Sequence, residues 1–395
     1  MKLWEKKYTL HSAVQSYTVG DDYVYDQQLV PYDCLGSIAH ATMLQKLDIV
    51  SEQECLQLHQ ALHEILTLHE QGEFKITQKD EDCHTAIENF LIEKVGAVGK
   101  KIHTGRSRND QVLTALRLYY KDQIQSIIMA ANDLIDTLTN LVNSDGTIAF
   151  PGYTHMRKAM PSSIGLWAGA FIESMKDNTH LLMHVNTLID QCPAGTGAGY
   201  DVPLPIDRTI IAKLLGFQKP QENSIYVQNS RGKFESSLLH AFTQIMIDLN
   251  KMASDLLLFS MPEMGFVSFP AEFCTGSSIM PQKMNLDVLE LTRAHYHQMV
   301  SWEMQIKTMS ANLISGYNRD LQLIKEPVMK GCACTKESIE VMTLLIKNIK
   351  IQKDACEKAM TSDLYATDKV YELVKKGVPF RDAYRQIARQ YSQGV

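Results

Sequence analysis

Long stretches without glycine or proline constrain the fold of this chain more than any other feature. Neither residue occurs between Gly105 and Gly146, and apolar side chains recur there at steps of three and four residues. That period predicts one continuous helix, which at about 1.5 Å per residue reaches on the order of 50 Å. The apolar positions are Val112, Leu116, Tyr120, Ile124, Ile127, Ala131, Leu134, Leu138 and Leu141.

The same pattern returns three times further along the chain. Residues 161–192, 233–261 and 287–314 each read as a long helix, the first with Pro161 in its opening turn. Strand-like alternation is rare and short, so the chain is predicted to form an all-α bundle of long helices. The apolar stripes extend around much of each helix, which is typical of helices that also meet other chains, and we expect a homo-oligomer.

Shorter helical patterns flank this bundle on both sides. We expect a helical N-terminal domain over residues 1–104, a central long-helix domain over 105–350 and a short helical C-terminal domain over 351–395. A chain of 395 residues is long enough for a large core divided in this way.

Composition argues against several classes of partner and site. The net charge of −6 gives no reason to expect a nucleic-acid surface. No apolar run approaches the roughly 18 residues of a membrane helix, and the first residues lack the apolar core of a signal peptide, so we expect a cytoplasmic location. The eight cysteines are scattered, with one close pair at Cys332 and Cys334, which predicts reduced thiols and no metal site.

Polar segments with glycine or proline interrupt the helices, and each has a simple structural explanation. Asn109 or Asp110 would cap the helix that follows. His155 would be an ordinary loop histidine, and Lys283 a solvated charge. The glycines at 195–199 suggest a dinucleotide loop, but G-x-G-x-G lacks the spacing of the third glycine and no strand pattern precedes it.

The segment TGSSIMPQKMN, residues 275–285, supports a chemical interpretation. A proton on carbon next to a carboxylate is a very weak acid, and its removal needs a positioned base and a cradle for the added negative charge. A serine becomes such a base where backbone N–H groups and a cation stabilise its alkoxide in a site closed to water. We therefore predict that Ser277 removes the proton and that Lys283 stabilises the resulting charge.

Other polar side chains suit a substrate that carries carboxylates. Arginine, amide and hydroxyl side chains hydrogen-bond to carboxylates, and the candidates are Arg106, Arg108, Asn109, Thr154 and Asn285. His155 is a candidate for protonating a leaving nitrogen, with Glu290 orienting it. His84, in the polar segment EDCHTAIEN, is a further candidate for substrate binding.

These motifs resemble those of a known superfamily. GSSIMPQKMN is similar to the loop G-S-S-x-M-P-x-K-x-N of the fumarase/aspartase superfamily, and HTGRSRNDQV resembles the version of a second region found in the argininosuccinate lyases. GYTH and YNRDLQLIKE point the same way, and the resemblance spans roughly residues 20–385. It implies an all-helical homotetramer that uses no cofactor and cleaves argininosuccinate to arginine and fumarate by anti β-elimination.

The resemblance also implies roles for individual residues. Ser277 would be the base, Lys283 and Asn285 would stabilise the intermediate, and His155, linked to Glu290, would be the acid. Each site would take its residues from three subunits. The substrate contacts that it implies are Asn109, Thr154, Tyr317, Gln322 and Lys325. Where relatives often have a substrate-binding serine near the N-terminus, this chain has Asp22.

Two alternatives remain open from the sequence. A sister lyase that releases fumarate from adenylosuccinate or aspartate would share the loop, and a non-catalytic structural protein can share the fold. HTGRSRNDQ and YNRDLQ favour argininosuccinate lyase over the sister enzymes. The presence of Ser277, His155 and Lys283 together favours an enzyme over a structural protein.

Overall fold

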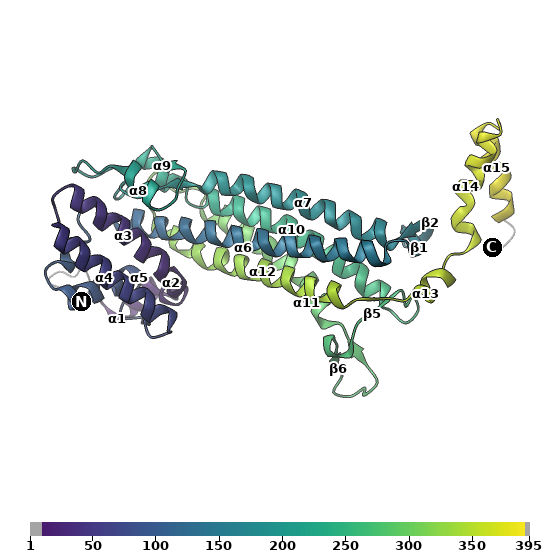
Figure 1. The fold of residues 1–395 in the computed structure, drawn as a ribbon, viewed down its shortest axis with the longest axis horizontal. Coiled ribbons are helices and arrows are strands. Elements are labelled where there is room, and N and C mark those ends of the chain that lie inside the picture. Colours follow the sequence, from purple (N-terminus) through teal and green to yellow (C-terminus); the bar gives the residue numbers. More distant parts are fainter. Residues whose placement is uncertain (1–9, 392–395) are drawn as a thin grey trace. The chain divides into compact units, whose positions relative to one another are not determined.

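The computed structural model describes residues 10–391 and is mostly helical, as the spacing of apolar residues predicts (Figure 1). Its longest helix, α6 (Arg108–Asp145), fills the stretch without breakers between Gly105 and Gly146. The other long helices are α7 (Ile164–Ile189), α10 (Lys233–Phe259), α11 (Asp287–Met309) and α12 (Lys325–Asn348). The predicted all-α class with long helices is confirmed.

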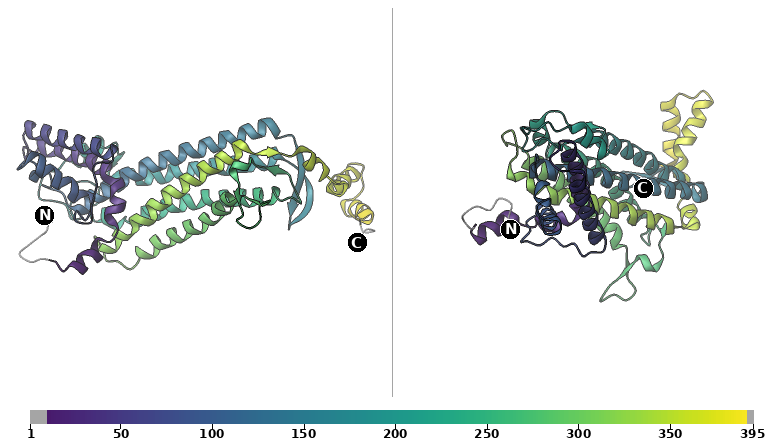
Figure 2. Two further views of the ribbon diagram at one scale, coloured as in Figure 1. Left: turned by 90° about the horizontal axis from the view of Figure 1, so that it is seen from below. Right: turned by 60° about the vertical axis from the view of Figure 1, so that its left-hand side comes forward.

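The chain forms two compact units, each of which contains part of every long helix. Unit 1 consists of the residues up to Ile127, Leu181–Phe242 and Val300–Ala333. Unit 2 consists of Ile128–His180, Thr243–Met299 and the residues from Cys334 onward. Within each unit, segments of the long helices lie side by side (Figure 2). The three domains expected from the sequence stay a prediction.

Unit 1 adds a set of shorter helices, some of which begin with a polar side chain that caps the first turn. The Oγ of Ser51 accepts a hydrogen bond from the N–H of Glu54, and the Glu54 carboxylate accepts one from the N–H of Ser51, so α4 begins with a capping box. The shorter elements are α1 (Ser12–Val19), α2 (Asp22–Asp26), η1 (Gln27–Leu29), α3 (Val30–Lys46), α4 (Glu52–Glu70), α5 (Cys83–Val95), η2 (Gly99–Lys101), α8 (Arg208–Leu214), α9 (Ser224–Asn229) and η4 (Arg319–Ile324).

The glycine-rich segment of unit 1 is a tightly packed loop. Gly195 and Gly197 have φ of 85° and 59°, and their N–H groups donate to Oδ2 of Asp110 at 3.0 and 2.9 Å. A Cβ on Gly197 would lie 2.8 Å from a side-chain carbon of Val202. These glycines therefore allow close packing within their own segment and against the first turn of α6. The neighbouring strands β3 (Gln191–Cys192) and β4 (Lys219–Pro220) pair in parallel.

A β-hairpin in unit 2 corrects the predicted start of one helix. Strand β1 (Ala149–Thr154) pairs antiparallel with β2 (Arg157–Ser163), and Pro161 lies in β2 opposite Pro151. Both strands of a two-stranded sheet are edge strands, where proline is tolerated. Helix α7 begins only at Ile164, and the Oγ of Ser163 accepts a hydrogen bond from the N–H of Leu166.

The remaining elements of unit 2 are short. Strands β5 (Val267–Ser268) and β8 (Lys350–Ile351) pair antiparallel, as do β6 (Thr275–Gly276) and β7 (Met284–Asn285). The other elements are η3 (Ala271–Phe273), α13 (Lys353–Lys358), η5 (Ser362–Tyr365), α14 (Ala366–Lys375) and α15 (Phe380–Tyr391).

Helix α11 ends at Met309, in unit 1, and not at the predicted Ile314. Asn312 beyond it has a φ of 61°, a left-handed conformation that asparagine tolerates and that an α-helix cannot contain.

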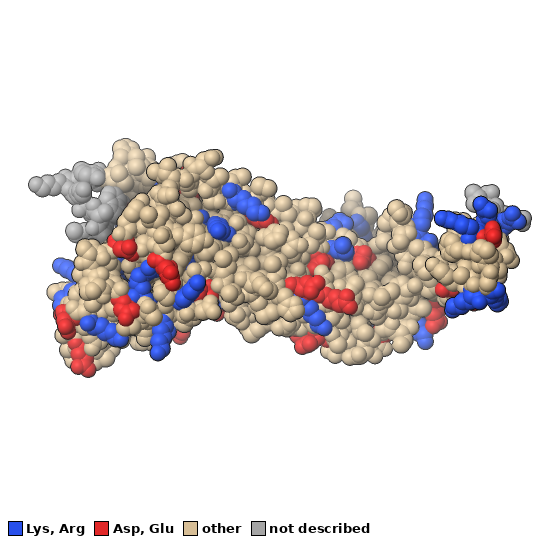
Figure 3. All heavy atoms as spheres, turned by 90° about the horizontal axis from the view of Figure 1, so that it is seen from above, with Lys and Arg blue, Asp and Glu red and all other residues tan. Residues whose placement is uncertain are grey.

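The structure places the surface charges and the cysteines that the composition counts. Acidic and basic side chains are intermingled on the face shown in Figure 3, and all eight cysteines carry free thiols. Among residues 10–391, no helix is long and apolar enough to cross a membrane.

Candidate active site

A cavity of about 490 Å³ in unit 1 brings together many of the predicted site residues. They come from the start of α5, the start of α6 and the segment between α11 and α12. The predicted residues that line it are His84, Arg108, Asn109, Tyr317, Gln322 and Lys325. The cavity is also lined by charged residues that the motifs had not assigned to substrate binding, namely Asp22, Glu81, Asp82, Arg231 and Arg319.

Lys325 is a fixed cation at the edge of this cavity. Its Nζ lies 2.7 Å from Oδ1 of Asp22 and 2.7 Å from Oδ1 of Asp26, and its side chain is buried. Burial opposes the positive charge, but Asp26 and Asp22 together raise the pKa of Lys325 above its ordinary value. Burial also raises the pKa of Asp22 to about 6, although Lys325 acts in the opposite direction.

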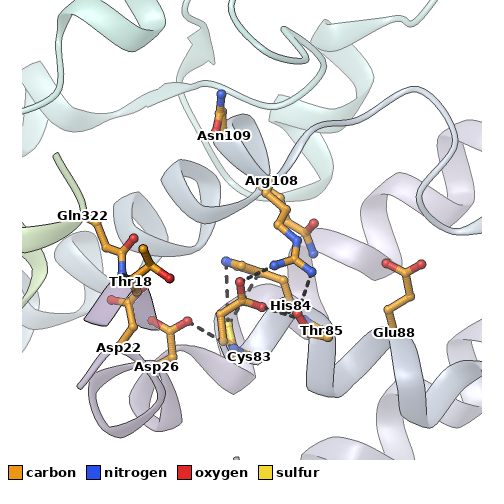
Figure 4. A network of polar contacts seen from close by, with 12 residues as sticks. Thr18, Asp22, Asp26, Cys83, His84, Thr85, Glu88, Arg108, Asn109 and Gln322 are labelled. Carbon is orange, nitrogen blue, oxygen red and sulfur yellow. Dashed lines mark hydrogen bonds and ion pairs between the residues drawn. The ribbon is translucent and has the colours of Figure 1, made fainter. Parts of the chain in front are cut away.

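Arg108 is tied to the beginning of helix α5 (Figure 4). Its Nη1 donates to Oδ2 of Asp82 at 2.5 Å, and its Nη2 donates to Oγ1 of Thr85 at 2.6 Å. The other carboxylate oxygen of Asp82 accepts the N–H of Thr85 at 2.8 Å and so caps α5. The guanidinium is therefore held in one orientation beside Asn109.

His84 forms a buried ion pair behind the cavity. Its Nδ1 lies 3.0 Å from Oδ2 of Asp33, and Nε2 of Gln111 donates to the same carboxylate at 2.9 Å. Burial opposes the charge on the imidazole, but Asp33 raises the pKa of His84 above its ordinary value. Burial likewise acts against ionised Asp33, but His84 lowers the pKa of Asp33. The pair and Gln111 anchor α5 to α3 and α6.

Asp26, Cys83 and His84 place potential metal-ligand atoms within 4.8 Å of one another. The ammonium of Lys325 already contacts Asp26 at 2.7 Å. Burial and the nearby carboxylates raise the pKa of Cys83 well above its ordinary value, so it remains a thiol, whereas metals bind thiolates. This set of donors does not suit a metal ion.

The loop that carries Ser277 is a hairpin in unit 2. Strand pairing sets Thr275 opposite Asn285, and Oγ1 of Thr275 donates to Oδ2 of Asp287 at 2.6 Å. The Oγ of Ser277 accepts hydrogen bonds from the N–H groups of Met280 at 3.1 Å and Ile279 at 3.4 Å. Backbone donors of this kind stabilise negative charge on the oxygen they contact.

Lys283 and Asn285 lie near the end of this loop, and Glu290 follows it in the chain. Lys283 is exposed, and its N–H donates to the carbonyl of Met280 at 3.0 Å. Asn285 is partly buried, whereas Glu290, in the first turn of α11, is exposed. The side chain of Lys283 is therefore free to turn toward a bound molecule.

His155 lies at the tip of the β1–β2 hairpin, directly after Thr154. His155 and Met156 form its two-residue turn and have φ of 51° and 59°. A type I′ turn requires positive φ at both positions and usually contains asparagine and glycine. Left-handed residues other than glycine cost free energy and often cluster at active sites. Within residues 10–391 no hydrogen bond or ion pair joins His155 to Glu290, so their link stays a prediction.

The predicted catalytic residues and two of the predicted binding residues, Thr154 and Asn285, lie outside this cavity. Unit 2 contains Thr154, His155, Ser277, Lys283, Asn285 and Glu290, and none of them lines the unit 1 cavity. Sequence reasoning did not assign Arg231, which lies between α9 and α10, to the site.

A protein-family model described as a lyase matches residues 5–300 of this chain. An argininosuccinate lyase of Thermotoga neapolitana is 50% identical over 392 residues, which are 99% of this chain and 98% of that protein. The argininosuccinate lyases of Sorangium cellulosum and Parabacteroides distasonis are 40% and 39% identical. Their alignments cover 99% and 100% of this chain, and 90% and 88% of those proteins.

Solved structures with lower identity share the fold. A fumarate lyase:delta crystallin from Brucella melitensis bound to cobalt superposes with a TM-score of 0.82 at 19% identity, covering 97% of this chain and 88% of that one. EDDS lyase in complex with formate gives 0.80 at 23% identity, covering 96% and 76%. A class II fumarase from Schistosoma mansoni gives 0.78 at 16% identity, covering 97% and 93%.

Proposed function

Because the chain belongs to the lyase family, and within it to the argininosuccinate lyases, we propose that it cleaves argininosuccinate to arginine and fumarate. It is a carbon–nitrogen lyase that acts on a small molecule. The observation that carries the proposal is the 50% identity over 99% of this chain and 98% of an argininosuccinate lyase. The alignment with that protein extends over both units.

In the proposed reaction, the Oγ of Ser277 removes a proton from the carbon next to a carboxylate. The electron pair of that C–H bond forms the carbon–carbon double bond of fumarate, and the carbon–nitrogen bond breaks. The N–H groups of Met280 and Ile279 contact the Oγ of Ser277 and favour its alkoxide form. Lys283 and Asn285 stabilise the extra negative charge that develops on the carboxylate.

The electron pair of the broken carbon–nitrogen bond stays on the nitrogen, which takes a proton as the bond breaks and so leaves as the guanidinium group of arginine. His155 is the proposed donor, and its place at a hairpin tip leaves the imidazole accessible. The cavity of unit 1 holds the substrate through Asn109, Tyr317 and Gln322, which line it together. No step of this mechanism uses a cofactor.

We infer that the enzyme is a homotetramer in which each site takes residues from several subunits. The cavity that contains Asn109 is lined by no residue of the Ser277 loop. A neighbouring subunit would supply this loop, as the family resemblance implies.

Release of fumarate tests the proposed function directly. Purified protein is mixed with argininosuccinate, adenylosuccinate or aspartate, and the ultraviolet absorbance of fumarate is followed. We expect turnover with argininosuccinate alone. Turnover with adenylosuccinate or aspartate instead would assign a sister activity, and no turnover with any substrate would indicate a structural protein on the same fold. A cytoplasmic location stays a prediction from the sequence.

A further inference from the structure

We propose that Thr275 and Asp287 are positioning residues, which close the base of the loop that carries Ser277 and so hold this serine in place for removal of the proton. The assignment of Ser277 as the base rests on the proposed function. The closure of the loop by Thr275 and Asp287 rests on the hydrogen bond between them, and it is measurable without turnover.

The loop of residues 276–284 is supported at its base. Strand pairing sets Gly276 opposite Met284 and Thr275 opposite Asn285. Most residues of the loop are exposed, and a Cβ on Gly276 would meet no atom within 4 Å. Within residues 10–391, no hydrogen bond or ion pair joins the loop to a segment outside residues 275–287. The conformation of the loop therefore depends on the contacts at its base.

One hydrogen bond at this base ties the first strand of the loop to a long helix. Oγ1 of Thr275 donates to Oδ2 of Asp287 at 2.6 Å, and Asp287 is the first residue of the 23-residue helix α11. This distance is typical of a hydroxyl that donates to an ionised carboxylate. Strand β7 is tied to α11 by the chain itself, because only Leu286 lies between them. Strand β6 depends on Thr275 for its link to the helix.

Ser277 follows directly after the strand that Thr275 ties down. The N–H groups of Met280 and Ile279 donate to its Oγ, and these contacts orient the hydroxyl relative to the loop but not relative to α11. The hydrogen bond from Thr275 to Asp287 fixes the preceding strand against the helix. A base must stay within hydrogen-bond reach of the proton that it removes. A loop that opens at its base would therefore lower the fraction of molecules that are able to react.

The carboxylate of Asp287 also has an ordinary structural role. Asp287 and Glu290 lie in the first turn of α11, where negative charge stabilises a helix. That role needs the carboxylate but not the hydroxyl of Thr275. Thr275 is exposed, so its hydrogen bond contributes little to the stability of the whole protein. Removing the hydroxyl alone therefore separates positioning of the loop from stabilisation of the helix.

Thr275→Val tests the positioning role, because valine has the shape of threonine and suits a strand but lacks the hydroxyl. Loss of one hydrogen bond corresponds to a roughly 5- to 10-fold change in population. We expect kcat for fumarate release from argininosuccinate to fall by this factor. KM should stay unchanged, because the cavity proposed to hold the substrate contains no residue of the loop. Thr275→Ser keeps the hydroxyl and should retain a kcat near that of the wild type.

Cleavage by trypsin after Lys283 measures opening of the loop without turnover. Lys283 is exposed, and a protease cuts segments that have opened locally. The fragments that end at Lys283 or begin at Met284, identified by mass spectrometry, should appear roughly 5- to 10-fold faster in Thr275→Val than in the wild type. Thr275→Ser should be cut at the wild-type rate.

Thr308→Val is the matched control. It removes an exposed hydroxyl from α11 that donates to the carbonyl of Met304 in the same helix at 2.9 Å, and it should change neither kcat nor the rate of cleavage after Lys283. Asp287→Ala removes the hydrogen bond from the other side. Because the bond is then already absent, adding Thr275→Val to Asp287→Ala should cause no further loss of kcat.

A wild-type kcat in Thr275→Val would overturn the positioning role, as would a loss of kcat in Thr275→Ser as large as that in Thr275→Val. A wild-type rate of cleavage after Lys283 in both Thr275→Val and Asp287→Ala would show that their hydrogen bond does not close the loop. Absence of fumarate release by the wild-type protein would reject the proposed function instead, and the cleavage rates would still decide whether Thr275 and Asp287 close the loop.

Discussion

Replacing Lys325 by methionine should destabilise the protein strongly, because two carboxylates would lose their cation. The side chains of Lys325, Asp22 and Asp26 are 4%, 15% and 0% exposed, and the ammonium contacts both acids at 2.7 Å. Removing one partner of a buried ion pair costs about 3–5 kcal/mol, since an uncompensated charge remains. Methionine keeps most of the apolar stem, so the loss reports charge and not a cavity.

The free energy lost in Lys325→Met should depend on pH, because the protonation of Asp22 depends on pH. Burial raises the pKa of Asp22 to about 6 even with Lys325 present, and Lys325 lowers it. Without the ammonium the pKa of Asp22 rises further, so the folded variant binds more protons than the unfolded chain between the ordinary and the raised pKa. Its stability therefore falls as pH rises through that window. We expect a loss of about 3–5 kcal/mol at pH 8 and a smaller loss at pH 5.

Urea unfolding followed by circular dichroism measures both losses. Lys283→Met is the matched control, because this lysine is exposed and a surface substitution changes stability by at most about 0.5 kcal/mol. Adding Asp26→Asn to Lys325→Met should recover part of the loss, since one buried charge is removed. A Lys325→Met protein as stable as the control at pH 8 would refute the stabilising role of the ion pairs that Lys325 forms with Asp22 and Asp26.

Three further substitutions test the chemistry and the electrostatics. Ser277→Ala should lower kcat at least ~100-fold with the oligomer intact, which is the range for losing a positioned base. Ser278→Ala should lower kcat less. If Ser277→Ala turns over near the wild-type rate, Ser277 is not the base. Lys283→Met should abolish fumarate release with little change in melting temperature, and retained activity would show an ordinary surface lysine. The stability gap between wild type and His84→Gln should shrink from pH 6 to pH 9 in urea unfolding. Asp33 raises the pKa of His84. The contribution of the pair to the free energy of unfolding is therefore complete below the ordinary histidine pKa of about 6.5 and is lost as pH rises through the raised pKa. A stability gap that widens with pH would contradict this.

The long helices were predictable because their signal is local. Apolar spacing and the absence of breakers between Gly105 and Gly146 are sufficient to define α6. The ends of other helices were not predictable in the same way. Pro161 fits the first turn of a helix as well as an edge strand, and only pairing with Pro151 decides between them. The turn beyond α11 depends on the left-handed conformation of Asn312, which the sequence permits without requiring.

The same difference between local and long-range signals applies to the residues of the candidate site. The chemistry of Ser277 and Lys283 was inferred from one short segment, because a catalytic loop carries its residues together. The pairing of Lys325 with Asp26 joins positions 299 apart in the chain, and no local pattern indicates it. Arg231 is distinguished by donors that find no partner after folding, a property of packing and not of sequence.

Mixed refolding of two inactive variants tests most directly the claim that subunits share each site. Ser277→Ala removes the base, and Asn109→Asp places a negative charge where the substrate carboxylates are proposed to bind. The two proteins are denatured together, refolded and assayed for fumarate release, with mixed tetramers verified by native mass spectrometry. If the residues come from different chains, about a quarter of the sites contain both native residues by symmetry counting, and activity returns. Mixed tetramers without activity would mean that one chain supplies both residues.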